Sequence, residues 1–190
     1  MTENAKTIDD FLRNCEPKLT ESATYLLKPF LSVVSLPKKH VLVKEKQICG
    51  KVYFICKGAS RSFYLQNGVE VHTWFAFENE VIGSLRNFNN LPSRENIELL
   101  EESVLIAFDI AGIQTLMQEN IEVANFVNVT ILEYALFMED KFFDLHMKPS
   151  NEKFSALLAH SPEIFQRVPL TYIASYLGIS RETLSRLRAK

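Results

Sequence analysis

The sequence has little of what several classes of protein require. Its cysteines, Cys15, Cys49 and Cys56, are odd in number and share no paired spacing, which indicates free thiols in a reducing compartment rather than a disulfide framework. No apolar run reaches the roughly 18 residues of a membrane span. The N-terminus, residues 1–17, is polar and acidic and is not typical of a secretory signal. We therefore expect a cytoplasmic protein with no membrane partner.

Catalytic and metal-binding patterns are also missing. The four histidines lie far apart and share no ligand spacing, so we expect no metal site. The sequence contains no G-x-S-x-G, H-E-x-x-H, G-x-G-x-x-G or P-loop pattern. Acidic residues gather at 95–102 and could suggest acid–base chemistry, but a solvated turn between strands explains Glu101 and Glu102 more simply. We predict no enzyme, no catalytic residue and no cofactor.

Apolar residues, in contrast, are plentiful. They make up 47% of the chain, with 14 Phe among them, and the formal net charge is −2. A chain of 190 residues with this composition can bury a core, as one large domain or two small ones. The period of the apolar residues then divides the chain into three parts.

The first part combines helices with many short strands. Residues 7–35 show apolar spacings near 3.6 and predict helices, whereas residues 38–109 alternate with a period of 2 and predict about eight short strands. Asn67-Gly68 is a strong hairpin signal because both residues accept the positive φ of a type I′ turn. Gly58 marks another tight turn. Short strands at this spacing favour an antiparallel barrel or jelly roll.

The second part is a long helix. After a short helix at 111–118, apolar residues recur at three- and four-residue steps over about 25 residues, or about 37 Å at 1.5 Å per residue. This stripe packs either on its own barrel or against a second copy in a coiled coil. Its members are Ala124, Val127, Ile131, Tyr134, Met138, Phe142 and Leu145.

The third part predicts a helix-turn-helix at 169–190. Gly178 can take the left-handed conformation that turns the chain, Ser180 can cap the second helix, and Pro169 is tolerated where the first helix opens. Residues 167–190 hold five Lys or Arg and one Glu in a chain that is net negative. Such a basic helix pair suits the DNA major groove. The apolar positions that two crossed helices must bury are Ile173, Leu177, Ile179, Leu184 and Leu187.

A β-rich domain, a long helix and a C-terminal helix-turn-helix, in that order, resemble the Crp/Fnr family of bacterial transcription regulators. The segment SRETLSR at 180–186 matches the family's recognition-helix pattern S-R-E-T-[VL]-x-R. The resemblance implies that Arg181, Glu182 and Arg186 read bases, while Ser180 and Thr183 contact phosphate. The DNA-binding residues that we predict are Ser180, Arg181, Glu182, Thr183, Ser185, Arg186, Arg188 and Lys190.

The resemblance also locates an effector pocket at Gly83, Ser84, Ser93 and Arg94. Gly83 matches the family glycine and Arg94 aligns with the phosphate-binding arginine, but Ser84 stands where cyclic-nucleotide-binding members have a glutamate. Glu95 stands at the usual Ser or Thr position, where its charge would repel a cyclic phosphate. We therefore expect no control by cyclic AMP; a different small effector, or a pocket filled by side chains, remains open.

Two further family features are expected to be missing. The three scattered cysteines do not match the four, mostly N-terminal, that an Fnr-type iron–sulfur cluster requires. The sequence stops at Lys190, so we expect a DNA-binding domain without a β-wing.

The predicted fold is α+β, in three regions. Residues 1–118 form a cyclic-nucleotide-binding-like sensor domain with N-terminal helices, 119–147 a long dimerisation helix, and 148–190 a helix-turn-helix DNA-binding domain. The predicted function is a homodimeric transcriptional regulator that binds double-stranded DNA, with RNA polymerase and an unidentified small effector as further candidate partners. The alternative is a ligand-binding or protein-interaction module of the same fold that binds no DNA.

Overall fold

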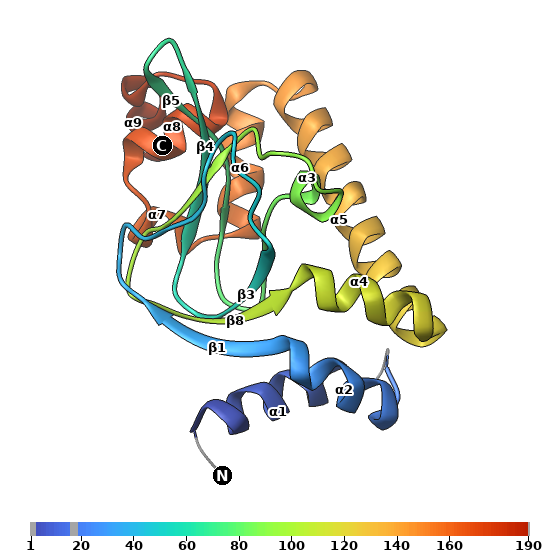
Figure 1. Cartoon of the computed structure of the whole chain (residues 1–190). Helices are drawn as coiled ribbons and strands as arrows, with labels where there is room; N and C mark the ends of the chain where they lie inside the picture. The colour runs from blue at the N-terminus through green and yellow to red at the C-terminus, as the bar shows by residue number, and fades with distance from the viewer. Residues whose placement is uncertain (1–2, 16–18, 190) are drawn as a thin grey trace.

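The computed structural model describes residues 3–15 and 19–189 of the chain (Figure 1). Helices open and close the chain and strands lie between them, which confirms the predicted α+β fold. The order is α1 (Glu3–Cys15), α2 (Glu21–Leu27), η1 (Lys28–Phe30), β1 (Leu31–Leu36), β2 (Val41–Val43), β3 (Lys51–Lys57), β4 (Ser60–Gln66), β5 (Val69–Ala76), β6 (Val81–Ile82), α3 (Leu85–Phe88), β7 (Asn96–Leu99), β8 (Ser103–Asp109), α4 (Ile110–Glu119), α5 (Ile121–Met147), α6 (Ser150–His160), α7 (Ile164–Arg167), α8 (Leu170–Leu177) and α9 (Arg181–Arg188).

The strands build the predicted barrel. Within the described residues they form two four-stranded antiparallel sheets, ordered β1-β8-β3-β6 and β2-β7-β4-β5. Alternate side chains of both sheets point into one apolar core, because successive residues of a strand face opposite sides. Ile55 and Leu105 from the first sheet and Ile97 from the second are each 0% exposed.

The predicted turns form as expected. Asn67 and Gly68, between β4 and β5, have φ values of 54° and 81°, which both positions of a type I′ turn require. Gly58 has a φ of 120°, and a Cβ atom there would lie 2.1 Å from the Ser103 hydroxyl oxygen. Glycine is therefore needed at 58 for both conformation and space.

The N-terminal helices close one end of the barrel. The Phe11 ring of α1 lies 4.7 Å from the Phe54 ring and 5.5 Å from the Phe108 ring, which come from β3 and β8. Thr20 caps α2, and its hydroxyl donates to a Glu122 carboxylate oxygen at 2.8 Å. This bond links the start of α2 to the first turn of α5 and so helps to hold that end of the long helix against the N-terminal helices.

Helix α5 carries apolar residues on two sides. Val123 is 0% exposed, and Val127 packs against the cluster that joins α1, α2 and α4 to the barrel. Met138 and Phe142 are 40% and 67% exposed. The predicted stripe is therefore divided between the helix's own chain and solvent, and it is not one seam. Exposed apolar residues also form an outward row, at steps of three, four and seven residues with Asp140 inside the longest step; its members are Val129, Leu132, Leu136, Phe143 and Met147, each at least 44% exposed.

This helix is long and apolar enough to cross a membrane, judged by length and composition only. The sequence criterion of an uninterrupted apolar run excluded such a span, because Glu133, Asp140 and Lys141 interrupt it. Length and composition do not distinguish a membrane span from a helix that pairs with a second protein surface. Charged residues in the second half of α5 favour the protein surface, because a charge at the bilayer centre is costly.

The C-terminal helices pack on the barrel rather than standing apart from it. Figure 1 shows α7, α8 and α9 beside β4 and β5. One apolar cluster contains Ala59, Phe77 and Leu100 from the barrel together with Ile173 and Leu177 from α8. The terminal helices therefore share a core with the barrel.

Ion pairs beside this core join the same two parts. The Arg167 guanidinium, at the end of α7, donates to both Glu78 carboxylate oxygens at 2.7 and 2.9 Å and also pairs with Glu101. The Gly58 N–H donates to Glu78 at 2.8 Å. Glu101 lies on the expected turn between β7 and β8 with its side chain 38% exposed, and it also binds an arginine, which the sequence did not predict.

The Glu78–Arg167 pair predicts a pH-dependent contribution to stability. Hydrogen bonding from Arg167 lowers the Glu78 pKa from 4.5 to about 2. A lowered carboxyl pKa stabilises the fold above about pH 4.5, and the contribution is lost as pH falls towards 2. Because the Glu78 side chain is 36% exposed, we expect Glu78→Gln to lower the free energy of unfolding by about 1–2 kcal/mol at pH 7 and by less at pH 3.5.

Urea unfolding at the two pH values measures this difference. Glu102→Gln is the matched control, since Glu102 is exposed and has no ion pair among the residues that the structure describes. An equal loss for Glu78→Gln at both pH values would contradict the assignment.

Candidate nucleic-acid interface

The last two helices and their turn form as the sequence predicts. Gly178 ends α8 in the left-handed region, with φ 67° and ψ 33°, and the Ile179 N–H donates back to the Ala174 carbonyl at 3.0 Å. The Ser180 hydroxyl accepts the Thr183 N–H at 3.1 Å and caps α9. Leu184 of α9 is 0% exposed, so the second helix is held against the first by a buried side chain.

The opposite face of α9 is open to solvent. The turn places most of the predicted DNA-binding residues on this one surface. Thr183 is half-buried, and its hydroxyl accepts from the Arg186 guanidinium at 3.3 Å. Lys190 lies outside the described residues. The predicted residues that are exposed are Ser180, Arg181, Glu182, Ser185, Arg186 and Arg188.

The charged side chains on this face form no salt bridge among the residues that the structure describes. The Arg188 guanidinium lies 5.6 Å from the centre of the Phe165 ring. Arg167 was counted with the basic C-terminal residues in the sequence, but it binds Glu78 and Glu101 and does not belong to the exposed face. Hydrogen bonds from its own N–H and from the Ser180 hydroxyl lower the pKa of Glu182, so this side chain is an ionised acceptor.

The predicted effector residues lie on the segment from β6 through α3 to β7. A Cβ atom at Gly83 would lie 2.7 Å from the Val52 side chain, so the backbone approaches β3 closely there. Ser84 and Ser93 are buried, at 5% and 3% exposed. Arg94 is exposed. The arginine that the resemblance assigned to phosphate is therefore on the surface.

Glu95 turns towards the barrel wall instead. Its carboxylate accepts hydrogen bonds from the Ser62 hydroxyl and, at 3.3 Å, from the Thr73 hydroxyl, on β4 and β5. Tyr134 of α5 is also close: burial, and then the charge of Glu95, raise its pKa to about 12. A carboxylate thus occupies the position at which the resemblance places a phosphate-binding hydroxyl. An anion there would be repelled.

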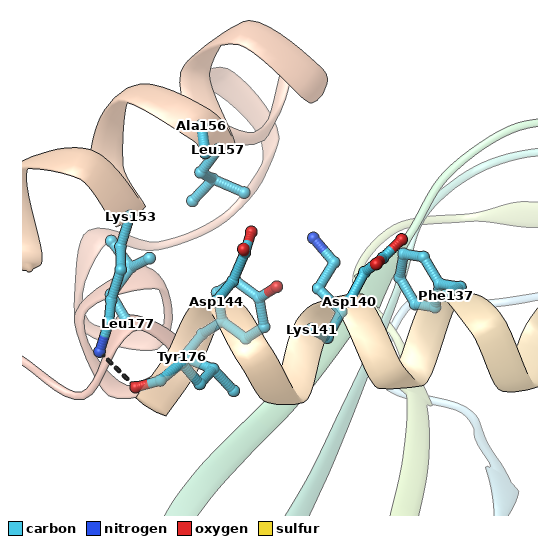
Figure 2. A pocket seen from close by; sticks show the side chains of 10 residues that line it. Phe137, Asp140, Lys141, Asp144, Lys153, Ala156, Leu157, Tyr176 and Leu177 are labelled. Atoms are coloured by element: carbon cyan, nitrogen blue, oxygen red, sulfur yellow. Dashed lines mark hydrogen bonds between the residues drawn. The ribbon is translucent and has the colours of Figure 1, made fainter. Parts of the chain in front are cut away.

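A cavity of about 250 Å³ lies where α5 meets α6 and α8 (Figure 2). Leu157 of α6 and Leu177 of α8 form part of its lining, and the Lys153 ammonium donates to the Leu145 carbonyl at 2.6 Å. Its volume is below the roughly 300–1,000 Å³ of sites for drug-sized ligands. Packing at this joint is therefore less complete than in the core beneath α8.

Other polar groups at the barrel surface were missed by sequence reasoning. Arg61, His72 and Tyr172 form a buried group between β4, β5 and α8. No short-range pattern connects them, because Tyr172 lies about a hundred residues further along the chain. Arg61 pairs with Glu98 and Phe75, on the outer face of the sheet that α8 covers, so its position in the strand gave no signal of burial.

Comparisons with known proteins agree with the fold described above. Residues 33–120 match the family described as the cyclic nucleotide-binding domain. The structure of FixK2 from Bradyrhizobium japonicum has 19% identity and a TM-score of 0.72, and the match covers 84% of this chain and 83% of that one. The chain has the Crp/Fnr fold.

Two further structures with the Crp/Fnr fold extend the match. A putative transcriptional regulator of the crp/fnr family from Eubacterium rectale has 17% identity and a TM-score of 0.70, covering 91% of this chain and 83% of that one. CLP from Xanthomonas campestris, described as c-di-GMP responsive, has 16% identity and a TM-score of 0.65, covering 87% of both chains. A comparison with curated proteins found no match.

The position of Glu95 generates a prediction about cyclic AMP. A ligand at a hundred times its dissociation constant stabilises a protein by about 2.7 kcal/mol, which raises Tm by about 5–10 °C for a chain of this size. We expect cyclic AMP at millimolar concentration to leave Tm unchanged. Thermal unfolding followed by circular dichroism measures it, and Glu95→Gln, which keeps the shape and removes the charge, is the matched variant. Clear stabilisation of the unmutated chain would show the assignment to be wrong.

Proposed function

We propose that this protein is a homodimeric, sequence-specific DNA-binding transcriptional regulator of the Crp/Fnr type, acting in the bacterial cytoplasm. The observation that carries the proposal is the exposed face of α9, where Arg181 and Arg186 form no salt bridge among the described residues. Solvent-exposed guanidinium groups on a capped, core-anchored helix suit the major groove, where arginine bonds bidentately to guanine. The Crp/Fnr fold supports the same conclusion.

Each residue of the face has a role in this proposal. Arg181 and Arg186 read guanine edges, and Glu182 accepts from a cytosine amino group. Ser180, Thr183, Ser185, Arg188 and Lys190 contact the phosphate backbone, which sets position without reading sequence.

The second copy binds through α5. In its outward apolar row, Leu132 and Leu136 are each more than half exposed in one chain, and apolar residues that repeat on one face of a helix pair well with a second copy. Two copies would place two recognition helices about 34 Å apart, one turn of DNA, on a near-palindromic site. RNA polymerase is a further proposed partner.

Control by cyclic AMP is not part of the proposal, because Glu95 opposes an anion at the phosphate position. A small effector of different chemistry that binds near Gly83, Ser84, Ser93 and Arg94 would have to favour one arrangement of the domains to regulate. The second candidate function is a ligand-binding or protein-interaction module without DNA binding. It is disfavoured by the exposed arginines of α9.

Selection of bound sequences from a random DNA pool, at moderate salt, tests the proposed function. We expect an enriched motif with two-fold symmetry and half-sites one helical turn apart. An absence of enrichment would favour the module that binds no DNA.

Substituting one base-reading residue gives a sharper prediction. Arg186→Ala is expected to weaken binding to the selected site by about 1–3 kcal/mol and to relax preference at one position of each half-site. Fluorescence anisotropy on the selected site and on random duplex measures both. Lys51→Ala removes an exposed cation from the barrel, outside the proposed effector site, and is the control. Equal losses on selected and random DNA would contradict base reading by Arg186.

The dimer seam is tested by placing a charge in the outward row of α5. Leu136, 53% exposed in the single chain, becomes buried in the proposed dimer, so Leu136→Asp should shift the mass in light scattering from two chains to one. Ile48→Asp changes a residue of similar exposure, 51%, on the barrel and should leave the mass unchanged. A Leu136→Asp protein that stays dimeric would exclude this face as the seam.

A further inference from the structure

Helix α8 lies across the edge of the second barrel sheet. Strand β5 is the last strand in the order β2-β7-β4-β5, so its outer backbone groups have no neighbouring strand among the residues that the structure describes. The Ser175 hydroxyl, on α8, accepts the His72 N–H at 3.1 Å and donates to the Glu70 carbonyl at 3.3 Å. One side chain of α8 thus satisfies two backbone groups of the sheet edge, which defines where along β5 the helix sits.

A buried arginine lies beneath this contact. Arg61 of β4 is 4% exposed, and its Nε donates to Glu98 at 3.0 Å while its terminal nitrogens bind both Glu70 oxygens. Its charge is therefore paired within the barrel. The guanidinium lies between two aromatic rings, 4.2 Å from the centre of Phe63 and 4.4 Å from the centre of Tyr172. Only Tyr172 comes from the terminal helices.

The His72 ring completes the stack. It lies 4.3 Å from the Tyr172 ring, with an angle of 23° between the planes. Burial, and then the nearby charge of Arg61, lower its pKa to about 4, although Glu70 opposes this shift. The ring is therefore neutral at pH 7, and its Nε2 can accept from the Arg61 guanidinium at 3.0 Å. Tyr172 thus stacks on His72 and Arg61, two side chains of the barrel that also contact each other.

We propose that Arg61, acting through Tyr172, is a positioning residue for the DNA-reading helix. Helix α9 moves with α8, because Leu184 is buried in the cluster that holds Ile173 and Leu177. Holding α8 on β5 therefore fixes α9 relative to the barrel. Helix α5 starts from the base of the same barrel, so the contact also fixes α9 relative to the dimer seam.

This inference rests on the proposed function and has a specific consequence. In a dimer with both recognition helices fixed, binding the first half-site leaves the second helix already in place, so the second contact is intramolecular with a high effective concentration. Freeing α8 lowers that effective concentration. It does not change the contacts that one helix makes with one half-site.

Tyr172→Ala compared with Tyr172→Phe tests the positioning role. The alanine variant loses the ring over Arg61, whereas the phenylalanine variant keeps it. Removing Arg61 itself would leave Glu70 and Glu98 without their partner, so Tyr172 is the safer position. We expect Tyr172→Ala to bind the selected two-half-site duplex about tenfold more weakly than Tyr172→Phe, the size of a desolvated cation–π contact. Both variants should bind a single half-site duplex equally.

Hydrogen exchange of the α8 amides supplies a readout that needs no DNA. We expect exchange in residues 170–177 to be about tenfold faster in Tyr172→Ala than in Tyr172→Phe, with the barrel strands other than β5 unchanged, since the His72 N–H of β5 bonds to Ser175 of α8. Equal exchange in the two variants would overturn the inference. Equal or tighter binding of the two-half-site duplex by Tyr172→Ala would also overturn it, as would equal losses on both duplexes.

These outcomes separate the inference from the proposed function. If the unmutated chain selects no DNA sequence, the proposed function fails, and positioning for DNA fails with it. Hydrogen exchange then still decides whether Tyr172 anchors α8 to the barrel.

Discussion

The constraint on which this structure depends is that the terminal helices are too few to bury a core of their own. Residues 150–188 form four short helices, and segments of about 40 residues usually need disulfides, metals or a partner surface to fold. The barrel supplies that surface through Ala59, Phe77 and Leu100. The arrangement of α9 is therefore a property of the whole chain. The apolar contact between the terminal helices and the barrel has no preferred direction. The Arg167–Glu78 ion pair and the contact of Arg61 with Tyr172 are directional and add to it.

Local features were predictable from the sequence, because their causes lie within a few residues. The turn at Gly178, the Ser180 cap and the Asn67-Gly68 hairpin each depend on the conformational preference of one or two side chains. The exposed face of α9 was predictable from the positions of its apolar residues, because a helix that buries Leu184 leaves the arginines on the opposite side. The close approach of Gly83 to Val52 was not predicted, since Gly83 was named only through the family resemblance.

The features that could not be predicted depend on contacts between distant segments. The apolar stripe of α5 was assigned to one face, but a helix that touches its own barrel and also presents apolar residues outwards has no single apolar side. The inward turn of Glu95 depends on Ser62 and Thr73, and Arg61 meets Tyr172 only after the terminal helices have docked. A match to the cyclic nucleotide-binding domain describes the barrel without describing its ligand chemistry.

The outward row of α5 has a further consequence if it forms the proposed dimer seam. A seam made by one helix from each chain is small, so pairing would be governed by mass action over the range in which the protein accumulates. If, as proposed, only the pair binds both half-sites, DNA occupancy would rise with the square of the chain concentration. Modest changes in synthesis or degradation would then become steep changes in occupancy, with no small molecule required.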